Sequence, residues 1–145
     1  MSKVDEFLTK AEEQEIVDAI GKAEKNTSGE IRVHIEKENN IAPLDRAMEV
    51  FRNLNMENTE ERNGVIIYVA VKSKQFAIYG DKGINEKVGL DFWDCTKDAM
   101  ANQFKNGNFK QGLIDGILRA GEQLKTHIPY QSDDTNELSN EISRG

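Results

Sequence analysis

The stretch NGVIIYVAV, residues 63–71, decides the fold of this chain of 145 residues. From Val65 to Val71 every side chain is apolar or aromatic, at odd and at even positions alike. Successive side chains of a strand point to opposite faces, so a strand formed here is buried on both faces. Helices must then cover the sheet on each side. We therefore expect an α/β fold with residues 65–71 as its central strand.

A second strand is predicted downstream of the central one. Residues 75–79, with the sequence QFAIY, follow a short polar turn at residues 72–74. Two strands joined by so short a turn pair as an antiparallel hairpin. The chain should therefore return along the central strand.

A third strand is predicted upstream, at residues 31–36, where apolar and polar side chains alternate. Such alternation is typical of a strand with one buried face and one face in water. The predicted buried side chains are Ile31, Val33 and Ile35, and the predicted solvent-facing ones are Arg32, His34 and Glu36. A helix between this strand and the central one makes the two parallel, through a right-handed crossover. The fold class predicted is α/β, a small mixed β-sheet with helices on both faces.

Two helices are predicted in the first half of the chain. Thr9 and Glu12 form a capping-box pattern at the start of the first, which should end near Asn26. Pro43 opens the second, at a position where its missing amide hydrogen is harmless. One helix thus precedes the strand at residues 31–36, and the other follows it.

Two further helices are predicted after the hairpin. Asp91 is expected to cap the first of them, and Asn108 with Gln111 the second. Gly112 and Gly116 lie one turn apart on that last helix. This spacing favours close contact between the helix and the sheet.

The net charge is −7, from 26 acidic and 19 basic side chains. A negative surface repels phosphate backbones, so we expect no nucleic-acid binding. Residues 130–145 are mostly polar, and their four acidic side chains are set against one arginine. Such a composition is typical of disorder. We therefore expect one domain over residues 1–129 and an acidic disordered C-terminal tail over residues 130–145.

Cys95 is the only cysteine, so no internal disulfide can form, and none is needed in a reducing compartment. Residues Met1 to Glu6 are polar, with no apolar stretch behind them of the kind that marks a secretion signal. The longest apolar run, residues 65–71, is far shorter than the roughly 20 residues that span a bilayer. We therefore expect a cytoplasmic protein without membrane insertion.

Residues 79–85, with the sequence YGDKGIN, contain the candidate binding site. They follow the end of a strand, where ligands of α/β sheets gather, and glycine lets the backbone approach a bound group. The candidate ligand-binding residues are Gly80, Asp81, Lys82, Gly83 and Asn85. The alternative is an ordinary tight connection into the next helix. The stretch is not a phosphate-binding P-loop, because the GxxxxGK[ST] spacing is absent.

Asp81 and Asp91 are the candidate metal ligands. Oxygen ligands suit calcium or magnesium rather than zinc. Two carboxylates leave the coordination shell incomplete, so waters or carbonyls would have to supply the rest. Helix capping alone would also explain Asp91.

The remaining reactive side chains predict no site. His34 is expected at the surface of its strand, and His127 at a helix C-terminus, where a partly charged imidazole suits the helix dipole. Cys95 has no partner at metal-ligand spacing, which argues against zinc and haem. Ser28 and Ser73 lie in predicted turns with no nearby histidine, so a serine triad has no support.

The residues from about Phe7 to Pro129 resemble the TPM domain family, named for thylakoid-lumen, photosystem and modulator-type members. The matching pieces are TSGEIRV at 27–33, NGVIIYVA at 63–70, the segment 80–85, Asp91, and NGNFKQG at 106–112. The resemblance implies a Rossmann-like α/β sandwich with a site near the 80–85 loop, in some members with a divalent cation. Members are variously described as acid phosphatases or as accessory factors in assembling and maintaining membrane complexes. By this resemblance Asp81 and Asp91 are the site residues.

The chain departs from the family pattern at three points. Many members have Gly-Leu-Glu where this chain has Gly83-Ile84-Asn85, which removes a carboxylate. Members commonly carry an arginine in the hairpin turn, where residues 72–74 of this chain are Lys-Ser-Lys. Most members are exported and tethered by a transmembrane segment, and we expect neither feature here.

Two functions from different classes follow. The first is a binding or accessory module that meets an unknown protein partner through the loop cleft or the acidic tail. The alternative is a divalent-metal-dependent acid phosphatase acting on phosphomonoesters. A phosphatase needs a nucleophile or an activated water, together with cations that clamp the phosphate. Nothing in the sequence clearly supplies these, so we favour the binding module.

Overall fold

The computed structural model describes residues 8–38, 40–58, 63–72, 75–88, 91–127 and 142–144. In chain order its elements are α2 (Lys10–Glu24), β1 (Glu30–Glu36), α3 (Pro43–Asn53), the 3₁₀ turn η1 (Met56–Asn58), β2 (Gly64–Ala70), β3 (Gln75–Gly80), α4 (Lys82–Asn85), α5 (Asp94–Lys105), α6 (Phe109–His127) and β4 (Ser143–Arg144). None of the described helices combines the length and the apolar character needed to cross a membrane.

Strand β2 lies inside the sheet, whose strand order is β3-β2-β1-β4. It runs parallel to β1, from the pair Glu30 and Gly64 to the pair Glu36 and Ala70, and antiparallel to β3. All seven residues of β2 are buried. The predicted central strand, parallel crossover and hairpin are therefore confirmed.

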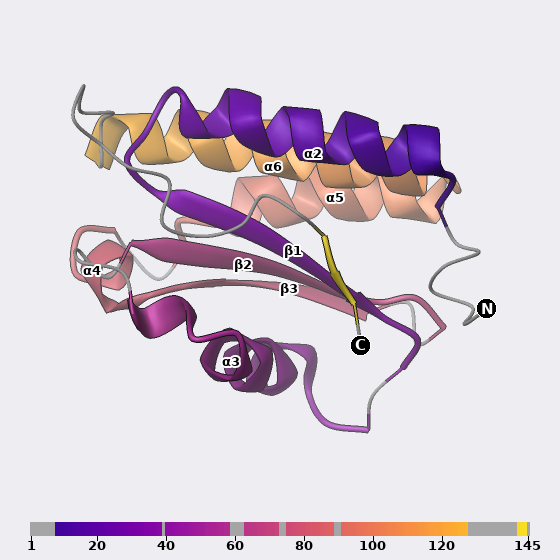
Figure 1. The fold of residues 1–145 in the computed structure, drawn as a ribbon, viewed down its shortest axis with the longest axis horizontal. Helices are drawn as coiled ribbons and strands as arrows, with labels where there is room; N and C mark the ends of the chain where they lie inside the picture. The colour runs from indigo at the N-terminus through magenta and orange to yellow at the C-terminus, as the bar shows by residue number, and fades with distance from the viewer. Residues whose placement is uncertain are drawn as a thin grey trace.

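Helices cover both faces of the sheet, as predicted (Figure 1). Helices α2, α5 and α6 form the layer on one face, and α3 lies on the other. Alternate residues of β2 supply the two cores. The larger core, beneath α2, α5 and α6, receives Val65, Ile67 and Val69, and the smaller core, beneath α3, receives Ile66, Tyr68 and Ala70.

The starts of the first two helices follow the predicted local rules. At α2, the Glu12 amide donates to Thr9 Oγ1 at 3.1 Å, and the Thr9 amide donates to Glu12 Oε1 at 3.0 Å. These are the two reciprocal bonds of a capping box. At α3, Pro43 is the first helical residue. Both predictions are confirmed.

The predicted start of α5 is wrong. The helix begins at Asp94, after Trp93 at the N-cap position, and no side chain caps it. Asp91 lies in the preceding turn, where its carbonyl oxygen accepts from the Asp94 amide at 3.1 Å. The chain thus turns once more before the helix begins, and Asp91 is left exposed.

Glycines of α6 allow close approach, but to helices rather than to the predicted sheet. A Cβ built on Gly112 would lie 2.4 Å from the Phe104 ring, and one on Gly116 would lie 2.4 Å from Met100 Sδ. Both partners belong to α5. These contacts bring α6 and α5 together into one closely packed layer.

The polar side of β1 is not in water, so that prediction is wrong. His34 and Glu36 are buried, at 5% and 4% exposed, and Arg32 is half-buried. Helix α3 lies over this face of the sheet. Both sets of alternating side chains on β1 are therefore shielded from water. The apolar ones face the layer of α2, α5 and α6, and the polar ones face the side covered by α3.

A short strand, β4, lies along the outer edge of β1 and was not predicted. Ser143 and Arg144 pair in parallel with His34 and Ile35. Further along the same edge, the Ile31 amide donates to Glu24 Oε2 at 3.0 Å. Of the predicted disordered tail, residues 130–141 and 145 lie outside the described residues.

We expect Gly121→Ala to lower the free energy of unfolding by about 1 kcal/mol. The new Cβ would lie 2.8 Å from Ala23 Cβ and 3.0 Å from its backbone Cα, which cannot rotate away. Overpacking costs about 1–3 kcal/mol, and the roughly 1 kcal/mol that Ala gains over Gly in a helix offsets only part of it. Urea denaturation measures the change.

Ala23→Gly supplies the control for this contact, because it removes the methyl group that Gly121→Ala would meet. In a double-mutant cycle the two changes together should cost clearly less than the sum of their separate effects. Additive effects would contradict the close approach of α2 and α6.

Candidate functional site

The predicted site follows β3, and the direction of β3 decides where it lies. Because β3 is antiparallel, its end lies beside the beginnings of β1 and β2. The Asp81 amide donates to the Gly64 carbonyl at 2.9 Å, and the Glu30 amide donates to the Asn63 carbonyl at 3.0 Å. The site is therefore at the amino ends of the parallel strands. Open α/β sheets usually bind ligands at the opposite, carboxyl ends.

Asp81 is the most buried member of the predicted site, at 1% exposed. Its carboxylate accepts from the Lys82 amide at 2.7 Å and caps the short helix α4. Lys82, Gly83 and Asn85 belong to that helix rather than to an open loop. The side chains of Lys82 and Asn85 are exposed, and Lys82 Nζ lies 4.0 Å from Glu86 Oε1.

Gly80 ends β3 against the side chain of Ile84. A Cβ on Gly80 would lie 3.2 Å from Ile84 Cγ2, so this glycine lets α4 fold back closely on the strand. Gly83 is a half-buried residue within the same turn of helix. Gly80 thus permits a compact strand-to-helix connection.

The predicted metal pair has one buried and one exposed member, Asp81 and Asp91. Within the described part of the chain, no group of three or more His, Cys, Asp or Glu side chains could hold a metal ion. A cation bound by this pair would need further oxygen ligands, from carbonyls or waters. Metal binding therefore stays a prediction.

Buried polar residues that the sequence analysis did not assign to the site gather beside Asp81. We call Thr27, Ser28, Glu30, Asn63 and Asp81, all buried, the polar edge. Thr27 Oγ1 accepts from the Gly29 amide at 3.0 Å, and Asn63 Nδ2 donates to the Ser28 carbonyl at 2.5 Å. The second of these bonds ties the segments before β1 and β2 to each other. The signal available was positional, because each residue lies at a strand end.

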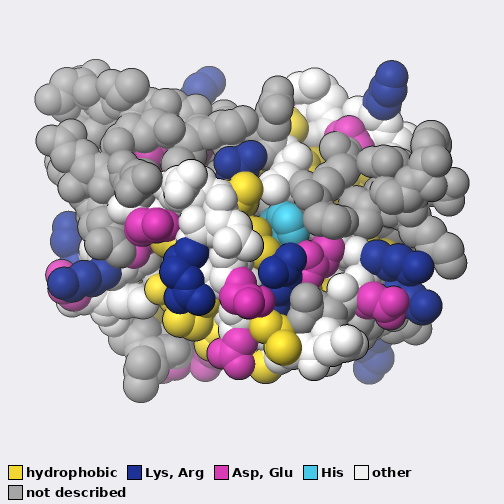
Figure 2. Space-filling model, turned by 60° about the horizontal axis from the view of Figure 1, so that its bottom comes forward, with side chains coloured by type: hydrophobic (Ala, Val, Ile, Leu, Met, Phe, Trp, Pro, Cys, Tyr) yellow, Lys and Arg dark blue, Asp and Glu magenta, His cyan; other side chains and the backbone are white. Residues whose placement is uncertain are grey.

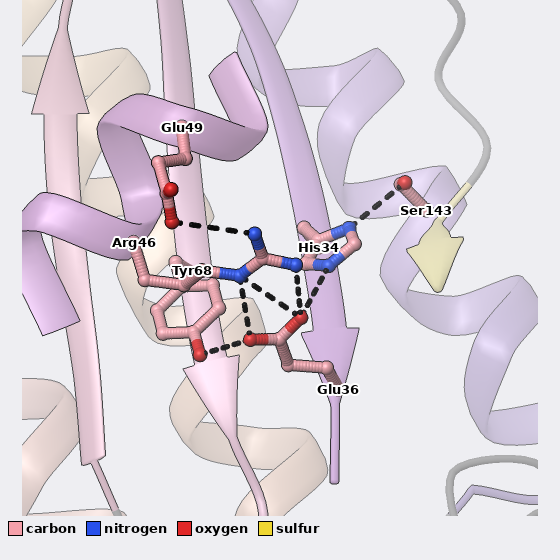
Figure 3. A network of polar contacts seen from close by, with 6 residues as sticks. All are labelled: His34, Glu36, Arg46, Glu49, Tyr68 and Ser143. Carbon is pink, nitrogen blue, oxygen red and sulfur yellow. Dashed lines mark hydrogen bonds and ion pairs between the residues drawn. The ribbon is translucent and has the colours of Figure 1, made fainter. Parts of the chain in front are cut away.

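A second polar cluster, the Glu36 network, lies between the sheet and α3 (Figure 3). Figure 2 shows the face of the molecule on this side, where basic and acidic side chains are interspersed. The network consists of His34, Glu36, Arg46, Glu49, Tyr68 and Ser143. Its members come from β1, α3, β2 and β4.

The carboxylate of Glu36 is the centre of this network. Arg46 donates to it from Nε and from a terminal nitrogen, each at 3.0 Å, and also reaches Glu49 at 3.5 Å. The Tyr68 hydroxyl donates to Glu36 Oε2. His34 Nε2 lies 3.2 Å from Glu36 Oε1, and its Nδ1 lies 2.9 Å from Ser143 Oγ.

Burial and bonding shift the pKa values of this network. Burial alone would raise the pKa of Glu36, but hydrogen bonds from Arg46, Tyr68 and His34 outweigh it and lower the pKa below 4.5. Burial lowers the pKa of His34 below 6.5, against the opposing effect of Glu36. Burial, followed by the bond to Glu36, raises the pKa of Tyr68. Near pH 7 an ionised Glu36 therefore faces a neutral His34.

The arrangement can anchor α3 rather than carry out chemistry. A neutral imidazole that donates from Nε2 to Glu36 leaves Nδ1 to accept from the Ser143 hydroxyl. The hydrogen bonds to the Glu36 carboxylate come from three side chains packed around it, those of His34, Arg46 and Tyr68. The network therefore joins α3 and β4 to the sheet through one buried carboxylate.

The fold defines this protein as an α/β domain with a mixed sheet and helices on both faces. The NMR structure of the BA42 protein from the psychrophilic bacterium Bizionia argentinensis is 62% identical, with a TM-score of 0.92 and 100% of both chains covered. The N-terminal domain of a protein from P. gingivalis is 18% identical, with a TM-score of 0.69, over 86% of this chain and 83% of that chain.

A third similar structure is the N-terminal domain of the cg2496 protein from Corynebacterium glutamicum. It is 10% identical, with a TM-score of 0.63, over 91% of this chain and 77% of that chain. At the two lower identities the likeness shows the fold alone. The family model of the TPM domain matches residues 2–123, and the chain belongs to this family, as the resemblance predicted. Among curated proteins, none matches this chain.

We expect Glu36→Gln to lower the free energy of unfolding by about 2 kcal/mol. The amide keeps the shape but withdraws the charge that Arg46 and Tyr68 bond, and hydrogen bonds to charged groups contribute about 1.5–3 kcal/mol. The matched control is Glu49→Gln, which alters the half-exposed partner of the same arginine and should cost under about 0.5 kcal/mol. If urea denaturation shows the same loss of unfolding free energy for Glu36→Gln and Glu49→Gln, then Glu36 is not the centre of the network.

The stability of the protein should fall as the pH is lowered from 7 towards 5, partly through His34. Its pKa is lowered in the folded protein, so between the folded and unfolded pKa values the unfolded chain binds more protons. Stability then rises with pH in that window and is lost below it. Melting temperatures of His34→Gln should depend less on pH over this range, whereas the exposed His127→Gln should keep the wild-type slope. Identical slopes for all three proteins would contradict a neutral buried imidazole.

Proposed function

We propose that this protein is a binding module whose ligand contacts the polar edge, rather than an enzyme. One observation carries the proposal: buried polar side chains from three separate connections meet at one end of the sheet. Thr27 and Ser28 precede β1, Glu30 is its first residue, Asn63 precedes β2, and Asp81 follows β3. Burying polar groups costs free energy unless they are bonded, so such a gathering needs a structural or functional reason.

The oxygen atoms at the polar edge are of the kind that bind a hard cation. Glu30 and Asp81 offer carboxylates, and Asn63 offers an amide oxygen. Calcium and magnesium prefer such ligands. Within this proposal, a calcium or magnesium ion bound through Asp81, with Asp91 as the predicted second ligand, would link the domain to its partner.

The alternative, a metal-dependent acid phosphatase, has less support from the geometry. Phosphate transfer needs cations that clamp the phosphate oxygens. Of the predicted site residues only Lys82 is cationic, and it is exposed beside Glu86. The carboxylates of the polar edge would repel a phosphate unless a metal ion were bound first. The phosphatase therefore depends on metal binding, and the same test bears on the cation proposed for the binding module.

The proposal also includes a cytoplasmic location and an unknown protein partner. A single exposed cysteine requires no oxidising compartment. The acidic residues 130–145 would suit a basic surface on that partner. Among the described residues on the face drawn in Figure 2, basic side chains are interspersed with acidic ones, which supports a partner other than nucleic acid.

We expect calcium or magnesium to raise the melting temperature with increasing concentration. A ligand that binds only the folded state stabilises it, by about 2.7 kcal/mol at a hundred times its Kd. Asp81→Asn should abolish this response while leaving the metal-free protein nearly unchanged, because asparagine also caps helices well. The control is Asp94→Asn, an exposed carboxylate that pairs with Lys97 and should leave the response intact.

The same proteins distinguish binding from catalysis. A panel of phosphomonoesters, with and without EDTA, should give no turnover with the wild-type protein. Turnover that EDTA and Asp81→Asn both abolish would favour the phosphatase instead. If neither calcium nor magnesium changes the melting temperature, the proposed metal site is wrong. The proposal would then be reduced to a binding module that works without a metal ion.

A further inference from the structure

A cavity of about 560 Å³ lies at the opposite end of the sheet from the polar edge. It opens between the end of β2, the start of β3 and the turn from α5 to α6. The apolar side chains that line it include Val69, Val71, Phe76, Ala101, Phe104 and Phe109. Small-molecule sites of proteins commonly occupy about 300–1,000 Å³ and have mainly apolar and aromatic walls. The carboxyl ends of parallel strands are also where α/β sheets usually place a ligand.

The aromatic wall of this cavity is held in place by the helix layer. The rings of Phe104 and Phe109 stack, with centroids 4.9 Å apart, and Phe76 meets Phe104 edge-on at 5.2 Å. Phe104 also lies directly on Gly112, where a Cβ would come within 2.4 Å of its ring. A side chain at position 112 would push this ring away. The wall is thus built into the contact between α5 and α6.

Two lysines lie at or beside the described part of the cavity rim, although the chain as a whole carries a charge of −7. Lys105, in the last turn of α5, lines the cavity and is exposed to solvent. Lys72 directly follows the lining residue Val71 and is also exposed, with Glu38 3.9 Å away. Exposed ion pairs at such distances are weak, so Lys72 still contributes positive potential. An apolar interior with a cationic rim suits an amphipathic anion.

We propose that this cavity binds a medium-chain fatty acid, with the alkyl chain between the phenylalanine rings and the carboxylate at Lys105. The apolar walls can stabilise a ligand through dispersion contacts and the burial of its apolar surface. Both interactions suit an unbranched hydrocarbon chain. Of the described lining residues, Lys105 carries the one ammonium group, which matches a singly charged head group. The site is separate from the polar edge, so either one stands without the other.

An NMR titration of the full chain with octanoate tests the proposal, with 1-octanol as the uncharged probe of equal chain length. Octanoate should shift the amide signals of cavity residues such as Val71, Ala101 and Gly107. Lys105→Gln should weaken octanoate binding about two- to fivefold, the range expected for an exposed ion pair, and leave octanol binding unchanged. Lys97→Gln, which removes a lysine elsewhere on α5, should alter neither.

A second variant tests the cavity itself. Ala101 is exposed on α5 while lining the cavity, so Ala101→Leu should fill the space without disturbing the core. It should weaken both probes at least tenfold. Asn102→Leu adds the same side chain at the next exposed position, outside the cavity, and should leave both affinities unchanged.

Four outcomes would overturn the proposal. The first two are the absence of shifts below the micellar concentration, and shifts confined to other residues. The third is equal binding of octanoate and octanol, with no effect of Lys105→Gln, which would remove the carboxylate from the assignment. The fourth is a change of the cavity signals with protein concentration alone, since a second copy of the chain would then fill the space.

Discussion

The burial of β2 on both faces is the constraint from which the rest of the structure follows. Its seven residues alternate between two cores, one beneath α2, α5 and α6 and one beneath α3. Removing either helix layer would expose every second side chain of this strand. A strand with two buried faces also needs partners on both edges, which β1 and β3 provide. The short hairpin places β3, and the crossover through α3 determines that β1 is parallel.

The two helix layers are attached in different ways, and this difference explains the buried charges. The layer of three helices has a large apolar core and glycine contacts that bring backbones together. Helix α3 covers the other face with only the short turn η1 beside it among the described residues. Its core is smaller, and Arg46 joins it to Glu36 on β1. A buried ion pair does not by itself show that a protein is more stable. Its hydrogen bonds are directional, however, so they fix the position of the Arg46 side chain relative to Glu36. The network thus specifies where α3 sits.

Local patterns predicted the parts of the fold that depend on local physics. The apolar run at 65–71, the capping box at Thr9 and the proline at 43 each act through neighbours in sequence, and each was confirmed. The buried state of Glu36 depends on Arg46 and Tyr68, which no spacing along β1 reveals. Likewise the polar edge forms only when the start of β1, the segment before β2 and the end of β3 meet. Each of its residues lies at a strand end, but only Asp81 stood in a stretch that the sequence marked as a candidate site.

The outer edge of β1 also affects whether copies of this protein can associate through their sheets. An edge strand offers a row of amides and carbonyls to any other extended chain, and growth of a sheet between molecules begins there. Here β4 pairs with His34 and Ile35, and the Glu24 carboxylate accepts a hydrogen bond from the Ile31 amide. An incoming strand would have to displace a charged side chain and a paired segment before it could form its own ladder. Glu24, the last residue of helix α2, thereby helps to prevent the edge of the sheet from pairing with another molecule.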